Sequence, residues 1–135
     1  STKLVNEIKP SGFFDDIDVI QPVPMHWLKK IIRGYNQSEV LALAIAKEIG
    51  IEVGDCLKAR RGHKTQTRKN RIERWENTKD IFKIKNIAEI EHKHILVVDD
   101  VITTGATILA CCEEIHRESP TTRISVLSLG VTHLQ

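Results

Sequence analysis

The sequence predicts a single α/β domain over residues 1–135, with a mainly parallel central sheet flanked by helices. The chain length and its 41% hydrophobic content are sufficient for one compact core. Ile95–Val98 is a continuous apolar run, which is typical of a buried central strand of a parallel sheet. A helical pattern over Ala106–Arg117 and an alternating pattern over Arg123–Leu129 follow this run. Strand, helix and strand in this order predict a βαβ unit.

The part of the chain before this unit contains one strong helix signal and several weaker signals. Asn36 can cap a helix that runs to Ile49, Glu39 stands at the capping-box position, and Gly50 follows the apolar run as a stop. We also expect three short strands, at Asp18–Ile20, Cys56–Ala59 and Ile81–Ile84. A further helix is expected at Thr67–Asn77.

Positive charge is concentrated in one segment of the chain. The net charge is only +2, yet eight Lys or Arg and a single Glu lie between Lys58 and Arg74. A basic segment on a mildly acidic body predicts a local anionic partner, either phosphate groups or nucleic acid. Four of these cations, Arg68, Lys69, Arg71 and Arg74, are spaced as a helical stripe. Only Trp75 offers base stacking nearby, so direct DNA binding is the less favoured alternative.

Cysteine usage and hydropathy indicate a cytoplasmic protein. The three cysteines form no CxxC pair, and the histidines show no spacing typical of a metal site. The longest apolar run, Val40–Ala46, is too short to span a membrane. The first residues lack the apolar region of a signal peptide. We therefore expect a cytoplasmic location, no membrane span and no zinc site.

Residues Asp99 to Thr107 combine two acids, small hydroxyl residues and a glycine. We expect Asp99 and Asp100 to close the central strand, at the sheet edge where open α/β sheets bind ligands. A glycine and threonines at a helix N-terminus can bind a phosphate, whereas carboxylates repel it and suit sugar hydroxyls. Together they predict a site for a phosphorylated pentose. Receiver domains also carry an acidic pair, but they need a later phospho-acceptor aspartate, and no Asp follows Asp100.

The same segment, VVDDVITTGAT, resembles the phosphoribosyl pyrophosphate (PRPP) signature of type I phosphoribosyltransferases. The stretch QPVPMHWLKKIIRGYNQSEVLA is similar to the ComF/GntX subfamily, which is linked to competence and DNA uptake. This resemblance implies the type I phosphoribosyltransferase fold with a minimal hood over the acceptor site. Members of the subfamily often carry a cysteine-rich zinc ribbon before the transferase domain, and this sequence lacks one.

The resemblance also implies which residues bind each part of PRPP. The ribose hydroxyls would be bound by Asp99 and Asp100. The 5-phosphate would be bound by Thr103, Thr104, Gly105, Ala106 and Thr107. The pyrophosphate would lie near Pro24, Arg33, Asn36 and Gln37. Mg²⁺ is expected to be held through PRPP near the two acids, with no direct protein ligand.

Transfer of a phosphoribosyl group builds positive charge on the ribose and releases pyrophosphate. Cations must neutralise this leaving group, and a closing segment must keep water away from the ribosyl cation. The catalytic candidates, by charge and by resemblance to the family's mobile loop, are Lys58, Arg60, Arg61 and Lys64. We therefore expect a Mg-dependent phosphoribosyltransferase that uses PRPP and an unknown acceptor, a nucleobase or an amine.

A non-catalytic module is the competing interpretation of the same residues. Such a module would bind PRPP or a nucleotide, or would act as an accessory factor in DNA uptake. Its partners would then include single-stranded DNA or the competence machinery. A homodimer is compatible with either interpretation.

Overall fold

The computed structural model describes residues 2–25, 34–59, 81–102 and 105–131. Their centre is a three-stranded sheet with the order β1-β4-β5. Its strands are β1 (Val19–Pro22), β4 (His94–Ile102) and β5 (Arg123–Val131). Both pairings, β1 with β4 and β4 with β5, are parallel. The predicted α/β class with a mainly parallel sheet is thereby confirmed.

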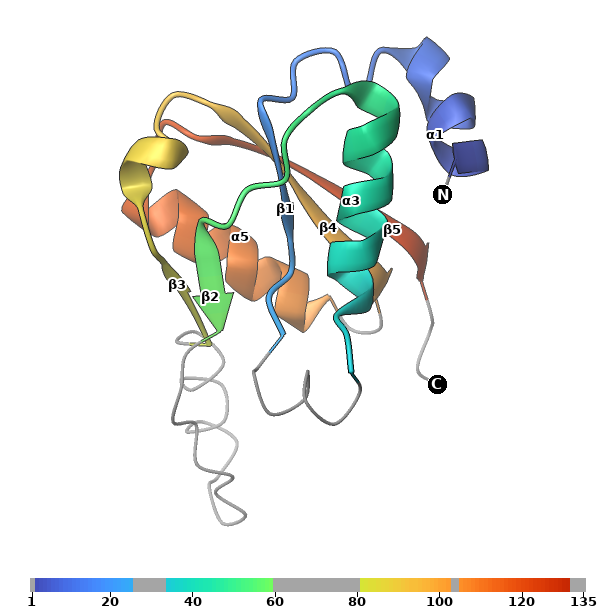
Figure 1. Cartoon of the computed structure of the whole chain (residues 1–135). Coiled ribbons are helices and arrows are strands. Elements are labelled where there is room, and N and C mark those ends of the chain that lie inside the picture. The colour runs from blue at the N-terminus through green and yellow to red at the C-terminus, as the bar shows by residue number, and fades with distance from the viewer. Residues whose placement is uncertain (1, 26–33, 60–80, 103–104, 132–135) are drawn as a thin grey trace.

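Two helices, α3 (Gln37–Ile49) and α5 (Ala106–Glu118), cover opposite faces of this sheet (Figure 1). Successive residues of a strand point to opposite faces. Accordingly, Ile95 and Val97 of β4 pack in one apolar core with α5, while Leu96 and Val98 pack in a second core with α3. No helix among the described residues is long and apolar enough to cross a bilayer.

Smaller elements complete these two cores. An antiparallel hairpin of β2 (Leu57–Ala59) and β3 (Phe82–Ile84) packs into the core that contains α5. It confirms the two short strands expected there, while the helix expected at Thr67–Asn77 lies outside the described residues. Three short helical segments were not predicted: α1 (Thr2–Ile8), η1 (Lys9–Ser11) and η2 (Ile87–Glu89).

The ends of α3 have the predicted capping residues. Asn36 has extended backbone angles, and its side-chain oxygen accepts a hydrogen bond from the amide of Ser38 at 3.0 Å. At the other end Gly50 adopts φ 74°, and its amide donates to the Ala46 carbonyl. Such a left-handed residue is typical of a helix C-terminus. The cap matters for the site because it fixes where the first turn of α3 begins.

The outer edge of β1 is covered by the segment that follows α3. The amide of Ile20 donates to the Glu52 carbonyl at 3.0 Å, and the amide of Gly54 donates to the Ile20 carbonyl at 2.7 Å. A Cβ at position 54 would lie only 2.6 Å from a methyl group of Val19. Only glycine therefore allows this segment to lie so close to β1.

Strand β4 is longer than the sequence predicts. Asp99 and Asp100 were expected to close it, but its pairing with β5 continues past them to Ile102, which pairs with Val131. The prediction that the strand ends at the two acids is wrong. The apolar run ends at Val98, whereas the backbone pairing with β5 continues to Ile102. Strand β1 is shorter, and its pairing with β4 ends at Pro22 and Val98. The acids thus lie in a strand beyond the end of its neighbour.

Candidate functional site

The candidate site lies at the carboxyl end of the sheet, where β1 stops and β4 continues. Asp99 and Asp100 are half-buried there. The N-termini of both sheet-covering helices belong to the same end, since α3 contacts Asp99 and α5 begins four residues after β4. Ligands of open α/β sheets bind at this end of the strands.

Ser38, in the first turn of α3, organises the acidic pair. Its hydroxyl donates to Asp99 Oδ1 at 3.1 Å and accepts from the amide of Asp100 at 3.2 Å. The same carboxylate oxygen of Asp99 accepts from the Asp100 amide at 2.9 Å. Burial raises the pKa of Asp99 above its ordinary value, the adjacent Asp100 raises it further, and the hydroxyl of Ser38 opposes both. A cation or a hydrogen-bond donor placed here would therefore be stabilised.

The segment Pro22–Pro24 is held by three hydrogen bonds from different parts of the chain. The amide of Val23 donates to the Val98 carbonyl at 2.9 Å, which extends the contact between β1 and β4. Asn36 Nδ2 donates to the Val23 carbonyl at 3.1 Å, and Gln21 Nε2 donates to the Pro22 carbonyl at 2.6 Å. This segment is therefore fixed before any ligand arrives.

Asn36 and Gln37 were both predicted to lie near pyrophosphate, but they differ in whether their side chains can contact a ligand. Asn36 is only 7% exposed, and both heteroatoms of its side chain already have protein partners, namely Ser38 and Val23. Gln37 is exposed as the first residue of α3, and Pro24 is half-buried. Asn36 thus supports the site through the backbone that it holds, whereas Gln37 presents a side chain to solvent.

The start of α5 has the backbone expected of a phosphate-binding turn. Gly105 adopts φ 82° as the N-terminal capping residue, and as a glycine it supplies no capping side chain itself. Ala106 and Thr107 are exposed in the first turn. The partial positive charge of a helix N-terminus favours an anion at this position. The other two predicted phosphate ligands, Thr103 and Thr104, lie outside the described residues.

Among the catalytic candidates, Lys58 lies in the part of the chain that the structure describes. It is exposed on β2 and pairs across the hairpin with Lys83, which is also exposed. Like charges that lie directly opposite each other repel, so a bound anion would relieve this pair. The remaining cations of the prediction, Arg33, Arg60, Arg61 and Lys64, lie outside the described residues.

The cysteines do not provide a nucleophile at this site. Burial raises the pKa of the Cys56 thiol to about 11, and it also raises the pKa of Cys111. Both thiols are therefore neutral near pH 7, and a neutral thiol is a weak nucleophile. Within the described ranges, no three His, Cys, Asp or Glu residues are grouped as a metal site.

Two residues of the site were missed from the sequence, Ser38 and Gln21. Each is buried and polar, and each bonds to a residue far away in the chain. Gln21 carried one available signal, its place directly after the strand expected at Asp18–Ile20, although that expectation ended one residue before it. Ser38 carried none, because a serine in a helix first turn is common on solvent-facing surfaces.

Comparison with known proteins gives a consistent result. The family model of the phosphoribosyl transferase domain matches residues 25–133. Competence protein F of Haemophilus influenzae is 32% identical over 95 residues, which are 67% of this chain and 41% of that protein. DNA utilization protein YhgH of Escherichia coli K12 is 28% identical over 92 residues, 67% of this chain and 40% of that protein. The chain thus spans less than half the length of these two relatives.

Solved structures agree on the fold. A purine phosphoribosyltransferase from Pyrococcus horikoshii superposes with a TM-score of 0.60 at 14% identity, over 97% of this chain and 80% of that chain. At such identity the likeness concerns the fold, namely a mainly parallel sheet between flanking helices.

Proposed function

The chain belongs to the phosphoribosyl transferase domain family, and from that premise we propose that it binds PRPP and transfers its phosphoribosyl group to an acceptor. One observation carries the proposal: two carboxylates and a glycine-capped helix N-terminus share the carboxyl end of the sheet. Carboxylates accept hydrogen bonds from a diol, and the helix N-terminus attracts a phosphate. A ribose 5-phosphate presents these two groups together.

In the proposed complex each part of the ligand contacts its own group of residues. Asp99 and Asp100 bind the ribose hydroxyls, while the amides of Gly105, Ala106 and Thr107 bind the 5-phosphate. Pro24 and Gln37 adjoin the pyrophosphate, and Asn36 fixes the segment that contains Pro24. Lys58 neutralises part of the pyrophosphate charge, together with Arg33, Arg60, Arg61 and Lys64, whose assignment rests on the sequence alone.

The reaction itself breaks the bond between ribose C1 and pyrophosphate oxygen. Pyrophosphate leaves with the bonding electron pair, a nitrogen of the acceptor forms the new bond at C1 with its lone pair, and the proton of that nitrogen passes to water or to the departing pyrophosphate. No covalent enzyme intermediate is needed, so the protein contributes by positioning the reactants and neutralising charge. The acceptor is a nucleobase or an amine.

The residues present fit Mg²⁺ as the cation of this reaction. Carboxylate oxygens are hard ligands of the kind Mg²⁺ prefers, and the pKa of Asp99, raised by burial and by Asp100, indicates a place where a cation is stabilised. Asp99 and Asp100 would hold the ion mainly through PRPP oxygens. Bound there, Mg²⁺ would neutralise charge that develops on the pyrophosphate.

Calorimetry with PRPP and Mg²⁺ tests the binding step. We expect binding that requires both acids, so that Asp100→Asn weakens it by about tenfold or more, because hydrogen bonds to charged groups contribute about 1.5–3 kcal/mol. A screen of pyrophosphate release across nucleobases and amines then tests the transfer step. Absence of PRPP binding by the unmodified chain would refute the proposal.

A second candidate function is an accessory, non-catalytic role in DNA utilisation. Two relatives are named for such roles, Competence protein F and DNA utilization protein YhgH. The basic segment between Lys58 and Arg74 also favours this role. PRPP binding without pyrophosphate release on any acceptor would support this role. Binding of single-stranded DNA that weakens steeply with salt would show that cations contact phosphate groups, and loss of this binding when the cations between Lys58 and Arg74 are replaced would identify the basic segment as the contact.

A further inference from the structure

Gln21 is a polar side chain inside an apolar core. It belongs to β1, is only 2% exposed, and has Val19 and Val23 as its neighbours on the same face of the strand. These valines pack in the core that contains α5 and the β2–β3 hairpin. Burial of an amide among apolar side chains costs free energy unless both its donor and its acceptor find partners.

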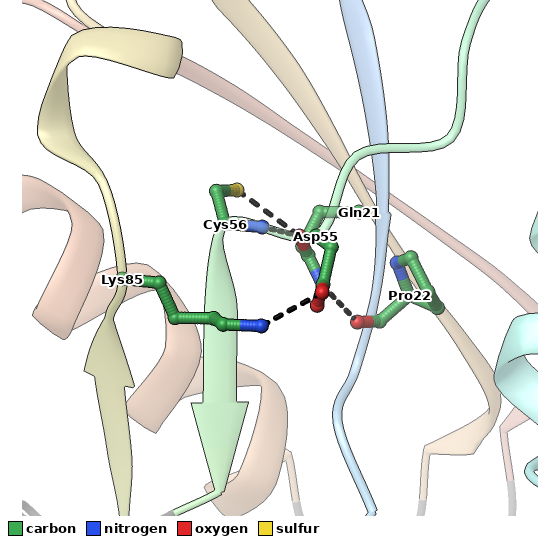
Figure 2. Close-up of polar contacts among 5 residues, drawn as sticks. All are labelled: Gln21, Pro22, Asp55, Cys56 and Lys85. Carbon is green, nitrogen blue, oxygen red and sulfur yellow. Dashed lines mark hydrogen bonds and ion pairs between the residues drawn. The ribbon is translucent and has the colours of Figure 1, made fainter.

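The amide of Gln21 uses both of its ends (Figure 2). Its Oε1 accepts from the backbone amide of Cys56 at 2.9 Å and from the Cys56 thiol at 3.0 Å. Its Nε2 donates to the carbonyl of Pro22 at 2.6 Å. One side chain therefore bonds two segments that lie 34 positions apart in the sequence.

These two segments carry different parts of the proposed site. Pro22 opens the segment that leads to Pro24, and Cys56 stands directly before β2, which carries Lys58. A neighbouring contact, between the residue before Cys56 and the residue after β3, is the ion pair of Asp55 and Lys85 at 2.7 Å, with exposed fractions of 81% and 41% (Figure 2). It joins the two ends of the hairpin and does not reach Pro22. Exposed ion pairs contribute little to stability, so the buried amide is the stronger of the two restraints.

We infer that Gln21 is a positioning residue that sets the distance between the Pro22–Pro24 segment and Lys58, and thereby the affinity for the pyrophosphate end of the ligand. The inference rests on the proposed function, since it assigns pyrophosphate to these two segments. Gln21 would thus affect the affinity for pyrophosphate without touching the ligand. The amide of Gln21 suits this place because it donates at one atom and accepts at the other.

The first test compares ligands that contain pyrophosphate with one that does not. Gln21→Met keeps the volume but removes all three hydrogen bonds of the side chain, and we expect about tenfold weaker binding of PRPP and of inorganic pyrophosphate, both with Mg²⁺. Ribose 5-phosphate should bind as tightly as to the unmodified chain, because its contacts lie at β4 and α5. Equal weakening of all three ligands would mean a general structural role and would overturn the inference.

Two control variants separate positioning from stability. Thr122→Val removes two buried hydrogen bonds of 2.7 Å, one to the Ile90 carbonyl and one with the Ser119 hydroxyl, at the end of the sheet opposite to the site. It should lower the free energy of unfolding as Gln21→Met does, yet leave pyrophosphate affinity unchanged. Asp55→Asn removes the exposed ion pair beside Cys56 and should change neither quantity appreciably. Loss of pyrophosphate affinity in both controls would also count against a specific role of Gln21.

A second variant keeps the test decisive if Gln21→Met does not fold. A protonated Glu at position 21 can still donate to the Pro22 carbonyl and accept from Cys56, whereas an ionised Glu cannot donate. At pH ~5 we therefore expect Gln21→Glu to bind pyrophosphate nearly as tightly as the unmodified chain does. As the pH rises, the pyrophosphate affinity of the variant should fall relative to that of the unmodified chain. A ratio of the two affinities that does not depend on pH would refute the positioning role.

The two proposals fail in different ways. If the unmodified chain binds no PRPP, the proposed function fails. If the unmodified chain binds PRPP, and Gln21→Met binds PRPP and pyrophosphate as tightly as the unmodified chain does, only the role of Gln21 fails.

Discussion

The hydroxyl of Ser38 donates a 3.1 Å hydrogen bond to Asp99 Oδ1 and so joins the first turn of α3 to strand β4. A hydrogen bond to a carboxylate favours its ionised form. We predict that Ser38→Ala raises the pKa of Asp99 further, which a carboxyl NMR titration would detect. Ser128→Ala is the control, because Ser128 pairs with Asp99 in the ladder but donates its hydroxyl to Gly130. An Asp99 pKa that stays equal in both variants would contradict this role of Ser38.

The raised pKa of Asp99 has a consequence for stability. Between its ordinary value of 3.8 and the raised value, the folded chain binds a proton that the unfolded chain has lost. The contribution of Asp99 to the free energy of unfolding therefore falls as pH rises through this window and levels off above it. Asp99→Asn should remove this fall, so that urea denaturation finds the variant more stable than the unmodified chain at pH 7. The same variant should bind PRPP about tenfold or more weakly.

Gly105 and Gly50 form a matched pair for testing the phosphate turn. Both adopt a positive φ, 82° and 74°, and a Cβ at either position would have no atom within 4 Å. Replacement by Ala should therefore cost about 1–2 kcal/mol of stability in each case, through backbone strain alone. Only Gly105→Ala should also weaken binding of ribose 5-phosphate in calorimetry. Equal ligand affinity of the two variants would remove Gly105 from the site.

Asn36 performs two tasks that two substitutions can separate. Asn36→Ser keeps an oxygen that can cap α3, but the shorter side chain cannot reach the Val23 carbonyl. Asn36→Ala loses both bonds and should be less stable than Asn36→Ser by about 1 kcal/mol, the usual contribution of a cap. Both variants should weaken PRPP binding, because each releases the segment that contains Pro24. Normal PRPP affinity of Asn36→Ser would show that the Val23 contact is dispensable.

Gly54 tests the close contact along the outer edge of β1. Gly54→Ala brings a Cβ to 2.6 Å from Val19, so we expect a loss of about 1–3 kcal/mol, measured by urea denaturation. Gly130→Ala is the control, because a Cβ there would meet no atom within 4 Å, and its effect should stay within about 0.5 kcal/mol. Similar losses in both variants would mean that the contact with Val19 does not decide the result, because the chain-entropy effect of Gly→Ala is stabilising.

Local patterns in the sequence were sufficient to predict the central βαβ unit and α3. The apolar run at Ile95–Val98 and the capping residues Asn36 and Gly50 act within a few residues of themselves, so their effect can be read in order along the chain. The contact of Ser38 with Asp99 joins residues 61 positions apart, and that of Gln21 with Cys56 joins residues 35 apart. No periodicity in the sequence encodes either pairing.

The prediction was least informative where polar residues of similar chemistry serve different purposes. Asn36 and Gln37 are adjacent polar residues, and the resemblance assigns both of them to the pyrophosphate. In the structure the first is used for capping and for holding Val23, while the second is exposed. Similarly, the acids at Asp99 and Asp100 end the apolar pattern, yet the backbone pairing with β5 continues past them. Side-chain hydropathy therefore located the site but not the end of the strand.

Strand β4 supplies Ile95 and Val97 to one apolar core and Leu96 and Val98 to the other. Neither core can therefore assemble without the strand that the other core also requires. Partial opening of one half would expose residues that hold the second half together, so the two clusters cannot melt as independent units. The described part of the chain should consequently unfold in one cooperative transition, with β4 among the backbone amides best protected from hydrogen exchange.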